Sequence, residues 1–138
     1  MKKVIATLIA LLTVSLSVFA ENNFSVKDII EEENRYERLK AKVASAEKSD
    51  WNTPFKAAKI YILKKKKMSE AYSWLEQSLQ AKVTPQNLEL KGDYLILHGL
   101  EREAFENYKA AIDLLISQGS EDFGQIQRKI QILANTTP

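Results

Sequence analysis

Apolar residues recur at helical spacing along most of the chain, and no stretch alternates apolar and polar residues as a strand would. Glycine and proline, which interrupt helices, number only four and three among 138 residues. The pattern therefore predicts an all-α protein. We expect helices over about 25–48, 53–65, 69–81, 84–98, 101–118 and 120–134.

Three of the expected helix starts have the clearest capping signal, a hydroxyl side chain that can accept a hydrogen bond from the first turn. These are Ser25, Thr53 and Thr84, and the two threonines are followed by Pro54 and Pro85. Proline suits the first turn because it lacks an N–H group that this turn would leave unbonded. The matched Thr-Pro starts indicate that one structural unit occurs twice.

The first 20 residues have the three-part layout of a secretory signal peptide. Lys2 and Lys3 precede an apolar run over 4–19, and the small residues that signal peptidase requires are present up to Ala20. We expect cleavage after Ala20 and export to the periplasm or the cell exterior. An uncleaved membrane anchor is the alternative, although the run is short beside the roughly 17–25 residues that span a bilayer.

Removal of that segment would leave a neutral chain. The sequence has 20 Lys and Arg against 18 Asp and Glu, and two of the lysines lie in residues 1–20. A neutral chain does not favour nucleic-acid binding, which uses a broad basic face. The chain has no cysteine, which excludes disulfides and thiolate metal sites. We expect a single core formed by packing alone.

The expected helices fall into three segments after residue 20. Residues 21–50 form a charged amphipathic helix, residues 51–118 contain two helix pairs, and residues 119–138 form a capping helix with a frayed tail. The first helix has only a thin apolar stripe, similar to a coiled-coil seam. This stripe consists of Ile29, Tyr36, Leu39, Val43 and Ala46. The capping helix is expected to bury Phe123, Ile126, Ile130 and Leu133.

Residues 51–118 contain an internal repeat. FKAAKIYILKKKKMSEAYSWLEQSL (55–79) aligns with LELKGDYLILHGLEREAFENYKAAI (88–112) without a gap. Three positions are identical, and several more agree in chemical class. A helix pair that recurs at this offset indicates a solenoid, in which each pair buries its apolar face against the next.

The second copy resembles a tetratricopeptide repeat. That family has small residues where its two helices approach, a glycine at the turn, and an aromatic residue in the second helix. These places are filled here, within KGDYLILHGLEREAFENYKAAI, by Gly92, Gly99, Ala104, Tyr108 and Ala111.

The first copy is a degenerate version of the same pattern. Ala71 fits it, Leu75 replaces the aromatic residue, and Lys59 stands at the place of Gly92. The resemblance implies antiparallel helix hairpins stacked as a short solenoid of two repeats, with an extra N-terminal helix and a C-terminal capping helix. A helical bundle with chance periodicity is the alternative. The residues expected to pack the repeats are Phe55, Ala71, Leu75, Gly92, Gly99, Ala104, Tyr108 and Ala111.

The resemblance also implies a groove, because tetratricopeptide proteins receive a partner's peptide or helix on the face formed by the first helices of successive pairs. Carried over residue by residue, this groove would be lined by Lys56, Ile60, Leu63, Lys64, Glu89, Asp93, Ile96 and Leu97. A mixed apolar and charged lining suits an extended or helical segment. The alternative is that its apolar members belong to the core, covered by the N-terminal helix.

Four consecutive lysines, Lys64 to Lys67, fall at the turn of the first hairpin. We interpret them as a solvated turn; contact with anionic lipid or with an acidic partner is the alternative. Membrane contact is otherwise expected only if the signal segment stays uncleaved. Charge is also uneven between the repeats, since residues 51–84 carry a net charge of +5 and residues 85–118 a net charge of −3. This difference either steers an association or belongs to a solvated surface.

Little in the sequence indicates catalysis. His98 is the only histidine, and the alignment places it at an exposed turn. Neither a phosphate-binding glycine loop nor a metal-ligand spacing occurs. We expect no catalytic residue, no metal site and no cofactor.

The leading hypothesis is an exported, non-catalytic adaptor or accessory subunit of the bacterial cell envelope that binds a protein partner. The rival is a structural or adhesive helical protein that forms homo-oligomers through residues 21–48. An inhibitor of another exported protein is also compatible with the sequence, although no feature indicates it. No nucleic-acid partner is expected.

Overall fold

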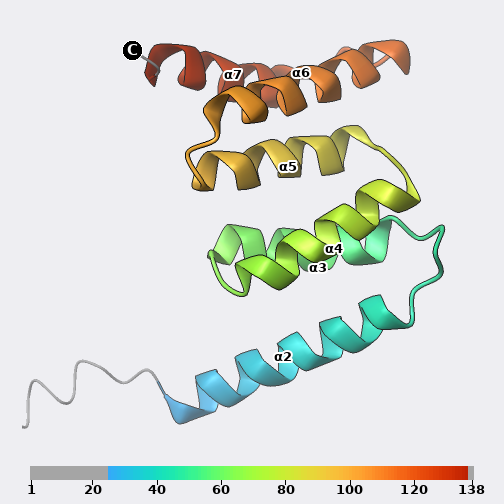
Figure 1. The fold of residues 1–138 in the computed structure, drawn as a ribbon, viewed down its shortest axis with the longest axis vertical. Coiled ribbons are helices and arrows are strands. Elements are labelled where there is room, and N and C mark those ends of the chain that lie inside the picture. Colours follow the sequence, from blue (N-terminus) through green and yellow to red (C-terminus); the bar gives the residue numbers. More distant parts are fainter. Residues whose placement is uncertain (1–24, 137–138) are drawn as a thin grey trace, which may run out of the picture. The chain divides into compact units, whose positions relative to one another are not determined.

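A computed structural model describes residues 25–136, which divide into two compact units between Arg38 and Leu39. The helices are α2 (Val26–Ala44), α3 (Asn52–Lys64), α4 (Met68–Ala81), α5 (Pro85–Leu97), α6 (Glu101–Ser117) and α7 (Gly124–Thr136), shown in Figure 1. No strand occurs within this range, so the prediction of an all-α protein is confirmed. The predicted signal peptide over 1–20 and the last two residues of the predicted tail lie outside the described residues.

Helix α2 crosses the division between the two units. The hydroxyl of Ser25 accepts a hydrogen bond from the first turn, as predicted, and the helix ends at Ala44, earlier than expected. The members of its predicted apolar stripe differ in burial. Tyr36 and Val43 are buried, whereas Ile29 is exposed.

Helices α3 and α4 form one hairpin, and α5 and α6 form the next (Figure 1). The starts of α3 and α5 are separated by the same offset that relates residues 55–79 to 88–112. The starts of α4 and α6 are separated by this offset too. The second hairpin stacks on the first through α4 and α5, and α7 packs on α6. The prediction of stacked helix hairpins is confirmed, and α7 follows them where the first helix of a third hairpin would.

The two hairpins begin with different caps. At α5, the Thr84 hydroxyl accepts a hydrogen bond from the Asn87 N–H at 3.2 Å, and the Asn87 side chain accepts one from the Thr84 N–H at 2.8 Å. This is the reciprocal arrangement of a capping box. At α3, the predicted Thr53 cap is wrong, because Asp50 Oδ1 accepts from the N–H groups of Asn52 at 2.9 Å and Thr53 at 3.1 Å. Hydrogen bonds from Thr53 lower the pKa of Asp50, and a negative charge suits a helix N-terminus.

A buried polar cluster joins the two hairpins. Asn87 and Ser78 are fully buried. The Asn87 amide donates to Ser78 Oγ at 3.1 Å and to the Lys82 carbonyl at 2.7 Å. Ser78 Oγ in turn donates to the Trp51 carbonyl at 2.7 Å. Both side chains are therefore satisfied, as buried polar groups must be, and they tie the end of α4 to the starts of α3 and α5.

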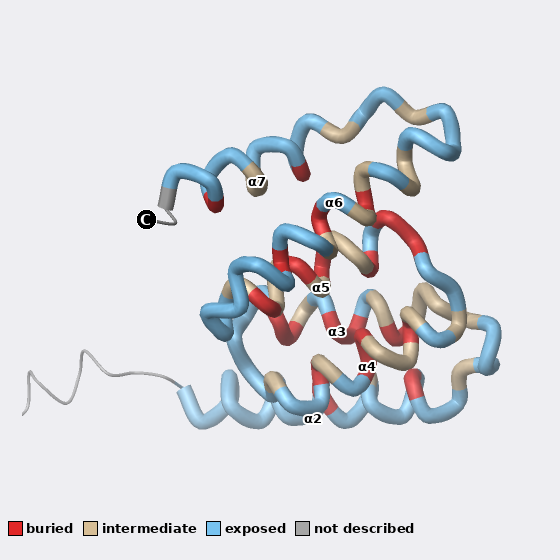
Figure 2. Tube along the Cα trace, turned by 45° about the horizontal axis from the view of Figure 1, so that its top comes forward, coloured by how far each residue is buried: buried red, intermediate tan, exposed pale blue. Residues whose placement is uncertain are grey.

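Each hairpin also has an apolar interior, visible in Figure 2 as buried positions along α3 to α6 and on one side of α7. In the first hairpin, Tyr61 and Trp74 meet edge to face with ring centroids 6.0 Å apart. The second hairpin shares its core with α7. The buried members of this core are Leu95, Ala104, Tyr108, Ala111, Ile126 and Leu133.

The helix ends are closed by residues in the left-handed conformation. Gly99 (φ 70°) and Gly119 (φ 74°) have it just after α5 and α6, close to the predicted ends of these helices. The first hairpin has no glycine at its turn, and Lys65 (φ 53°) and Lys67 (φ 48°) adopt this conformation instead. A side chain with a Cβ pays about 1–2 kcal/mol for it, so the first turn is the more strained of the two.

Helix α7 begins at Gly124, later than the predicted start at Ser120. Ser120 instead completes the closure of α6, because its N–H donates to the Leu115 carbonyl at 3.0 Å. Of the face predicted for α7, Ile126 and Leu133 are buried. The other two members, Phe123 and Ile130, are half-buried.

Candidate partner-binding groove

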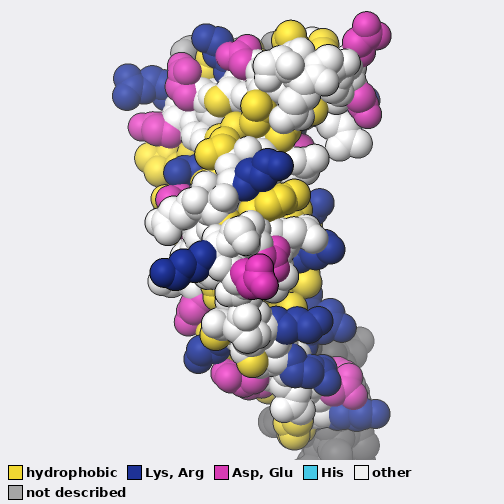
Figure 3. All heavy atoms as spheres, turned by 90° about the vertical axis from the view of Figure 1, so that its right-hand side faces the viewer, with side chains coloured by type: hydrophobic (Ala, Val, Ile, Leu, Met, Phe, Trp, Pro, Cys, Tyr) yellow, Lys and Arg dark blue, Asp and Glu magenta, His cyan; other side chains and the backbone are white. Residues whose placement is uncertain are grey.

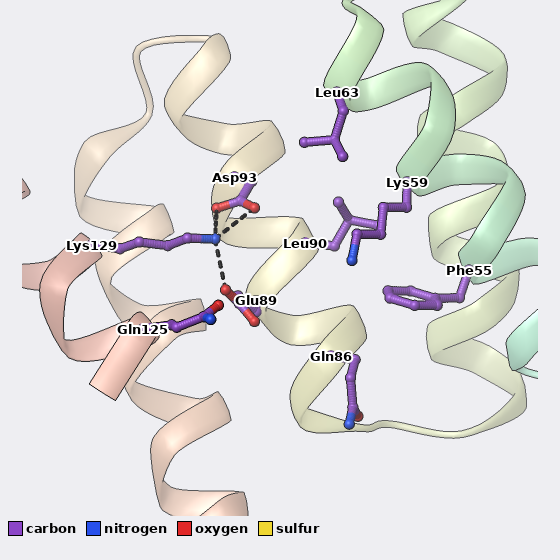
Figure 4. A pocket seen from close by; sticks show the side chains of 9 residues that line it. All are labelled: Phe55, Lys59, Leu63, Gln86, Glu89, Leu90, Asp93, Gln125 and Lys129. Carbon is purple, nitrogen blue, oxygen red and sulfur yellow. Dashed lines mark hydrogen bonds and ion pairs between the residues drawn. The ribbon is translucent and has the colours of Figure 1, made fainter. Parts of the chain in front are cut away.

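Helices α3 and α5, the first helices of the two hairpins, surround a hollow of about 230 Å³ together with α7; we name it the central hollow (Figure 4). Each helix contributes side chains from the edge that it turns toward its neighbour. The lining residues are Phe55, Lys59 and Leu63 of α3, Gln86, Glu89, Leu90 and Asp93 of α5, and Gln125 and Lys129 of α7. A lining from successive first helices is the arrangement that a solenoid groove requires.

A second hollow of about 190 Å³ continues from the central one toward the turn ends of α3 and α5. The two share Leu63 and Asp93, and together we name them the first-helix groove. The second one is the more apolar, so we name it the apolar hollow. Its lining residues are Ile62, Leu63, Lys65, Asp93, Ile96, Leu97 and Tyr108.

An ion-pair cluster occupies the side of the groove between α5 and α7. Lys129 Nζ donates to Asp93 Oδ1 at 2.6 Å and Oδ2 at 2.8 Å, and lies 2.7 Å from Glu89 Oε1 (Figure 4). Burial by itself would lower the pKa of Lys129, but the hydrogen bonds to Asp93 and Glu89 and their charges raise it. The lysine is therefore held protonated, and it secures α7 to α5.

Tyr108 of α6 also contacts this ion-pair cluster. Its hydroxyl donates to Asp93 Oδ1 at 2.7 Å, and its ring lies 5.6 Å from Lys129 Nζ. Burial raises the pKa of Tyr108, and the hydrogen bond to Asp93 raises it further. The ring also packs directly on Gly92, where a Cβ would lie 2.3 Å from Tyr108 Cε1. Only glycine allows this approach, so Gly92 sets the position of the ring and through it that of Asp93.

The structure brings five of the eight predicted groove residues together. Leu63, Glu89, Asp93, Ile96 and Leu97 line the first-helix groove. Leu63 is 63% exposed and Leu97 is 40% exposed. Both are therefore surface residues rather than members of the core.

The other three predicted groove residues, Lys56, Ile60 and Lys64, line neither hollow. Each directly follows a residue of α3 that does line the groove. One residue along a helix turns the side chain by about 100°. The groove lies between α3 and α5, so α3 presents only the edge turned toward α5, and these three side chains lie further round the helix.

The predicted repeat-packing residues lie mostly in the interior. Phe55 is half-buried and faces the central hollow, and Gly99 lies at the exposed turn. The buried members of the set are Ala71, Leu75, Gly92, Ala104, Tyr108 and Ala111.

Sequence reasoning missed the contribution of α7. Lys129 lies 36 residues after Asp93, a spacing that differs from the offset of the repeat. Alignment by that offset therefore does not place Lys129 opposite the acidic pair. The available signal was the position of α7 after the second hairpin, where a third first helix belongs, which implies that one of its faces continues the groove. The repeat pattern marks Lys59 only as a departure from the family, whereas the structure places it in the lining of the central hollow.

Charge is mixed on one face of the protein. In the face drawn in Figure 3, basic and acidic side chains are interspersed rather than gathered in separate halves. The four lysines of the first turn are exposed. His98 is also exposed, and its ring lies 4.4 Å from that of Tyr94.

Within 25–136, no three His, Cys, Asp or Glu side chains are placed to hold a metal ion. None of the helices in that part of the chain has the length and apolarity to cross a membrane. The first-helix groove, lined by side chains of α3, α5 and α7, is the candidate functional site of the described residues.

Comparison with protein families gives a match over nearly the whole chain. The sequence model of a family described as a tetratricopeptide repeat-like domain matches residues 6–135. The match covers both hairpins and begins inside the segment predicted as a signal peptide. Comparisons with curated proteins and with solved structures give no match.

Proposed function

Because the chain belongs to the tetratricopeptide repeat-like family, we propose that it is a non-catalytic protein–protein interaction module of the bacterial cell envelope. The first-helix groove receives an extended or helical segment of a partner protein. The protein is exported, and it acts as an adaptor or accessory subunit rather than as an enzyme.

The observation that carries this proposal is the lining of the groove. Its apolar end has exposed Leu63 and Leu97, while its acidic side chains are held by Lys129. Apolar anchors beside ordered polar groups suit the recognition of a helix or an extended segment. Exposed apolar side chains that gather at one hollow, rather than lie scattered singly, are typical of interaction sites.

Site-specific photocrosslinking in the native host tests the proposal. A photoreactive residue replaces Leu97 or Gln86 in the groove, and in a matched control it replaces Glu106, which is exposed on α6. We expect one protein to be crosslinked from both groove positions and not from the control position. The proposal is wrong if the groove positions crosslink nothing, or if the control captures the same protein equally well.

A substitution series then measures the contribution of the apolar end. Leu63→Asp and Leu97→Asp place a charge where the partner's apolar side chain would lie, and we expect each to weaken capture at least about tenfold, since burying an unpaired charge is costly. Both side chains are exposed, so the fold should persist. Unchanged capture by both variants would contradict the groove.

Export is a separate part of the proposal and has its own test. The basic start and the apolar run over 4–19 support it. We expect the protein purified from its host to begin at Glu21 by intact mass. A chain that retains residue 1 and sediments with membranes would show an uncleaved anchor instead.

A further inference from the structure

The start of α2 has an exposed apolar face followed by an acidic one. Val26 is 71% exposed, Ile29 is 55% exposed and Ile30 is 54% exposed. Their spacing of three and four residues places them on one side of the helix. Glu33 and Glu37, both exposed, continue the same side over the next two turns. We name these five residues the α2 stripe; an exposed apolar cluster of this kind commonly marks an interaction site.

The α3 side of the first-helix groove has the opposite character. Leu63 is exposed at the turn end of α3, and Lys59 of the groove and Lys56, which is exposed just outside the two hollows, follow toward the start of the helix; we name these two the α3 lysines. Helix α3 contains no acidic residue. Lys59 Nζ lies 5.8 Å from the centre of the Phe55 ring, a contact that leaves its charge available to a carboxylate.

The acidic side chains of the groove balance this charge only in part. Glu89 and Asp93 both bind Lys129, at 2.7 Å and 2.6 Å. Lys129 balances one of these two negative charges, and the remaining one is outnumbered by Lys59 and Lys65, which also line the groove, so a segment that enters along α3 meets a net positive charge. Charge complementarity then favours an acidic segment.

The spacings of the two surfaces correspond. Lys56 lies seven positions before Leu63, with the second lysine between them, and Glu37 lies seven positions after Ile30, with a glutamate between them. At 1.5 Å per residue both rows are about 10 Å long. In the row on α3 the apolar residue comes last, and in the row on α2 it comes first. Apolar residues therefore face each other, and lysines face glutamates, when the two helices run antiparallel.

We propose that the α2 stripe of one copy of this chain lies antiparallel to α3 in the first-helix groove of a second copy. Ile29 and Ile30 enter the apolar hollow, and Glu33 and Glu37 pair with the α3 lysines. The volume of about 190 Å³ suffices for aliphatic side chains, since a cavity of about 150 Å³ holds benzene. This inference rests on the groove of the proposed function, and the α2 stripe and an external partner compete for it.

Each copy has one α2 stripe and one first-helix groove, so the contact joins two different surfaces of the chain. Such contacts either close as a reciprocal pair or continue into a chain of copies. The charge pairs are exposed, so the association weakens as salt is added.

Sedimentation velocity on the full protein, as cells process it, tests the proposal over a series of concentrations. We expect concentration-dependent association that Ile30→Asp weakens at least about tenfold. Glu31→Lys is the matched control: Glu31 lies on another side of α2, where it is 66% exposed and pairs with Lys27. It should leave association unchanged. A wild-type protein that stays monomeric throughout overturns the proposal.

A charge exchange identifies the register. Glu33→Lys with Glu37→Lys should weaken association, and so should Lys56→Glu with Lys59→Glu. A mixture of the two double variants should associate better than either alone, because opposite charges face each other again. If the mixture does not recover, the α2 stripe does not contact the α3 lysines and the proposal is wrong.

The photocrosslinking described above separates this inference from the proposed function. If the groove positions capture an external protein while the purified chain stays monomeric, the proposed function stands and the inference fails. If Ile30→Asp abolishes self-association and leaves capture of the external protein intact or stronger, both stand. If the groove positions crosslink nothing, including a second copy, both fail.

Discussion

The helices of the two hairpins begin at matching positions of the sequence repeat, although α6 has 17 residues and α4 has 14, and the two hairpins are packed by different means. In the second, a glycine lets the ring of Tyr108 lie against α5. In the first, Leu75 takes the place of that ring, and the edge-to-face pair of Tyr61 and Trp74 fills the interior. The comparison shows that the two copies share helix starts and turn position, while different side chains pack their interiors.

The difference has a functional consequence. Tyr108 packed on Gly92 also holds Asp93, which Lys129 of α7 binds. The packing of the second hairpin therefore extends into the groove. In the first hairpin, Lys59 stands at the position equivalent to Gly92. The Lys59 side chain faces the groove and takes no part in packing the hairpin interior. The second hairpin supplies the acidic side chains of the ion-pair cluster, and the first hairpin supplies the positive charge of Lys59.

The largest effect should come from Gly92→Ala, which places a Cβ 2.3 Å from Tyr108 Cε1. Overpacking of this kind should lower the free energy of unfolding by about 3 kcal/mol. Lys59→Ala, at the equivalent and exposed position of the first hairpin, should change it by less than about 0.5 kcal/mol. Urea unfolding measures both. Equal effects at the two positions would contradict the proposed difference between the hairpins.

The same comparison predicts a rescue. Tyr108→Leu gives the second hairpin the residue of the first at this place. We expect Gly92→Ala to cost less in that background than in the wild type, because the clashing ring atoms are gone. A double-mutant cycle measures the coupling between contacting residues. Additive effects would show that the ring does not cause the requirement for glycine.

The next effect should come from the buried polar cluster between the hairpins. Asn87→Ala removes the capping partner of Thr84 and leaves buried groups without hydrogen bonds. We expect a loss of about 2 kcal/mol. Asn107→Ala is the control, since Asn107 makes a single exposed bond to the Glu103 carbonyl. Thermal unfolding compares the two variants. A loss no greater than that of the control would contradict the contribution of the buried polar cluster to stability.

A smaller effect should come from Lys129→Met, which leaves Glu89 and Asp93 without their cation. The groups are partly exposed, so we expect a loss of about 1 kcal/mol near pH 7. Arg128→Met, exposed on the same helix, is the control. A loss equal to that of the control would show that the ion-pair cluster contributes nothing to stability.

The alkaline pH dependence sharpens this test. The pKa values of Lys129 and Tyr108 are raised in the folded protein above ordinary values of 10.5 and 10.0. The folded state therefore keeps these protons more tightly than the unfolded state, and stability is lost as pH rises above about 10. Lys129→Met removes one of the two groups, so its loss should be shallower. Unfolding measured at several values between about pH 8 and pH 11 checks this.

The smallest effect should come from the strained turn of the first hairpin. Lys65→Gly relieves a left-handed side chain and should raise the free energy of unfolding by about 0.5–1 kcal/mol. Lys66→Gly, at the neighbouring position, should not raise it. In the second hairpin, Gly99→Ala should lower it by a similar amount. If Lys65→Gly destabilises the protein, strain does not distinguish the two turns.

Local sequence signals predicted the helices well. The Thr84 cap and the helix ends at Gly99 and Gly119 depend on residues only a few positions apart. The Thr53 cap failed because Asp50, three residues earlier, offers a charged acceptor to the same N–H groups. The early end of α2 and the late start of α7 are errors of the same local kind.

The candidate groove was less accessible to sequence reasoning. Spacing identified α3 and α5 as the helices that form it, but the side of α3 that faces α5 is set by how the hairpins stack. Three predicted lining residues are therefore each one position away from a residue that lines a hollow: Lys56, Ile60 and Lys64. Leu97 lines the apolar hollow because it lies at the end of α5, which the sequence located correctly.

The sequence by itself determined the repeat, the helix hairpins and the small residues between their helices, because each follows from periodicity or from neighbours along the chain. Only the tertiary structure decided that Lys129 binds Asp93 and Glu89, that Asn87 meets Ser78, and which edges of three helices share a hollow. These contacts depend on the rotation of each helix about its axis and on the angle between stacked pairs. Both are set by the fit of many side chains at once, and no single stretch of sequence encodes that fit.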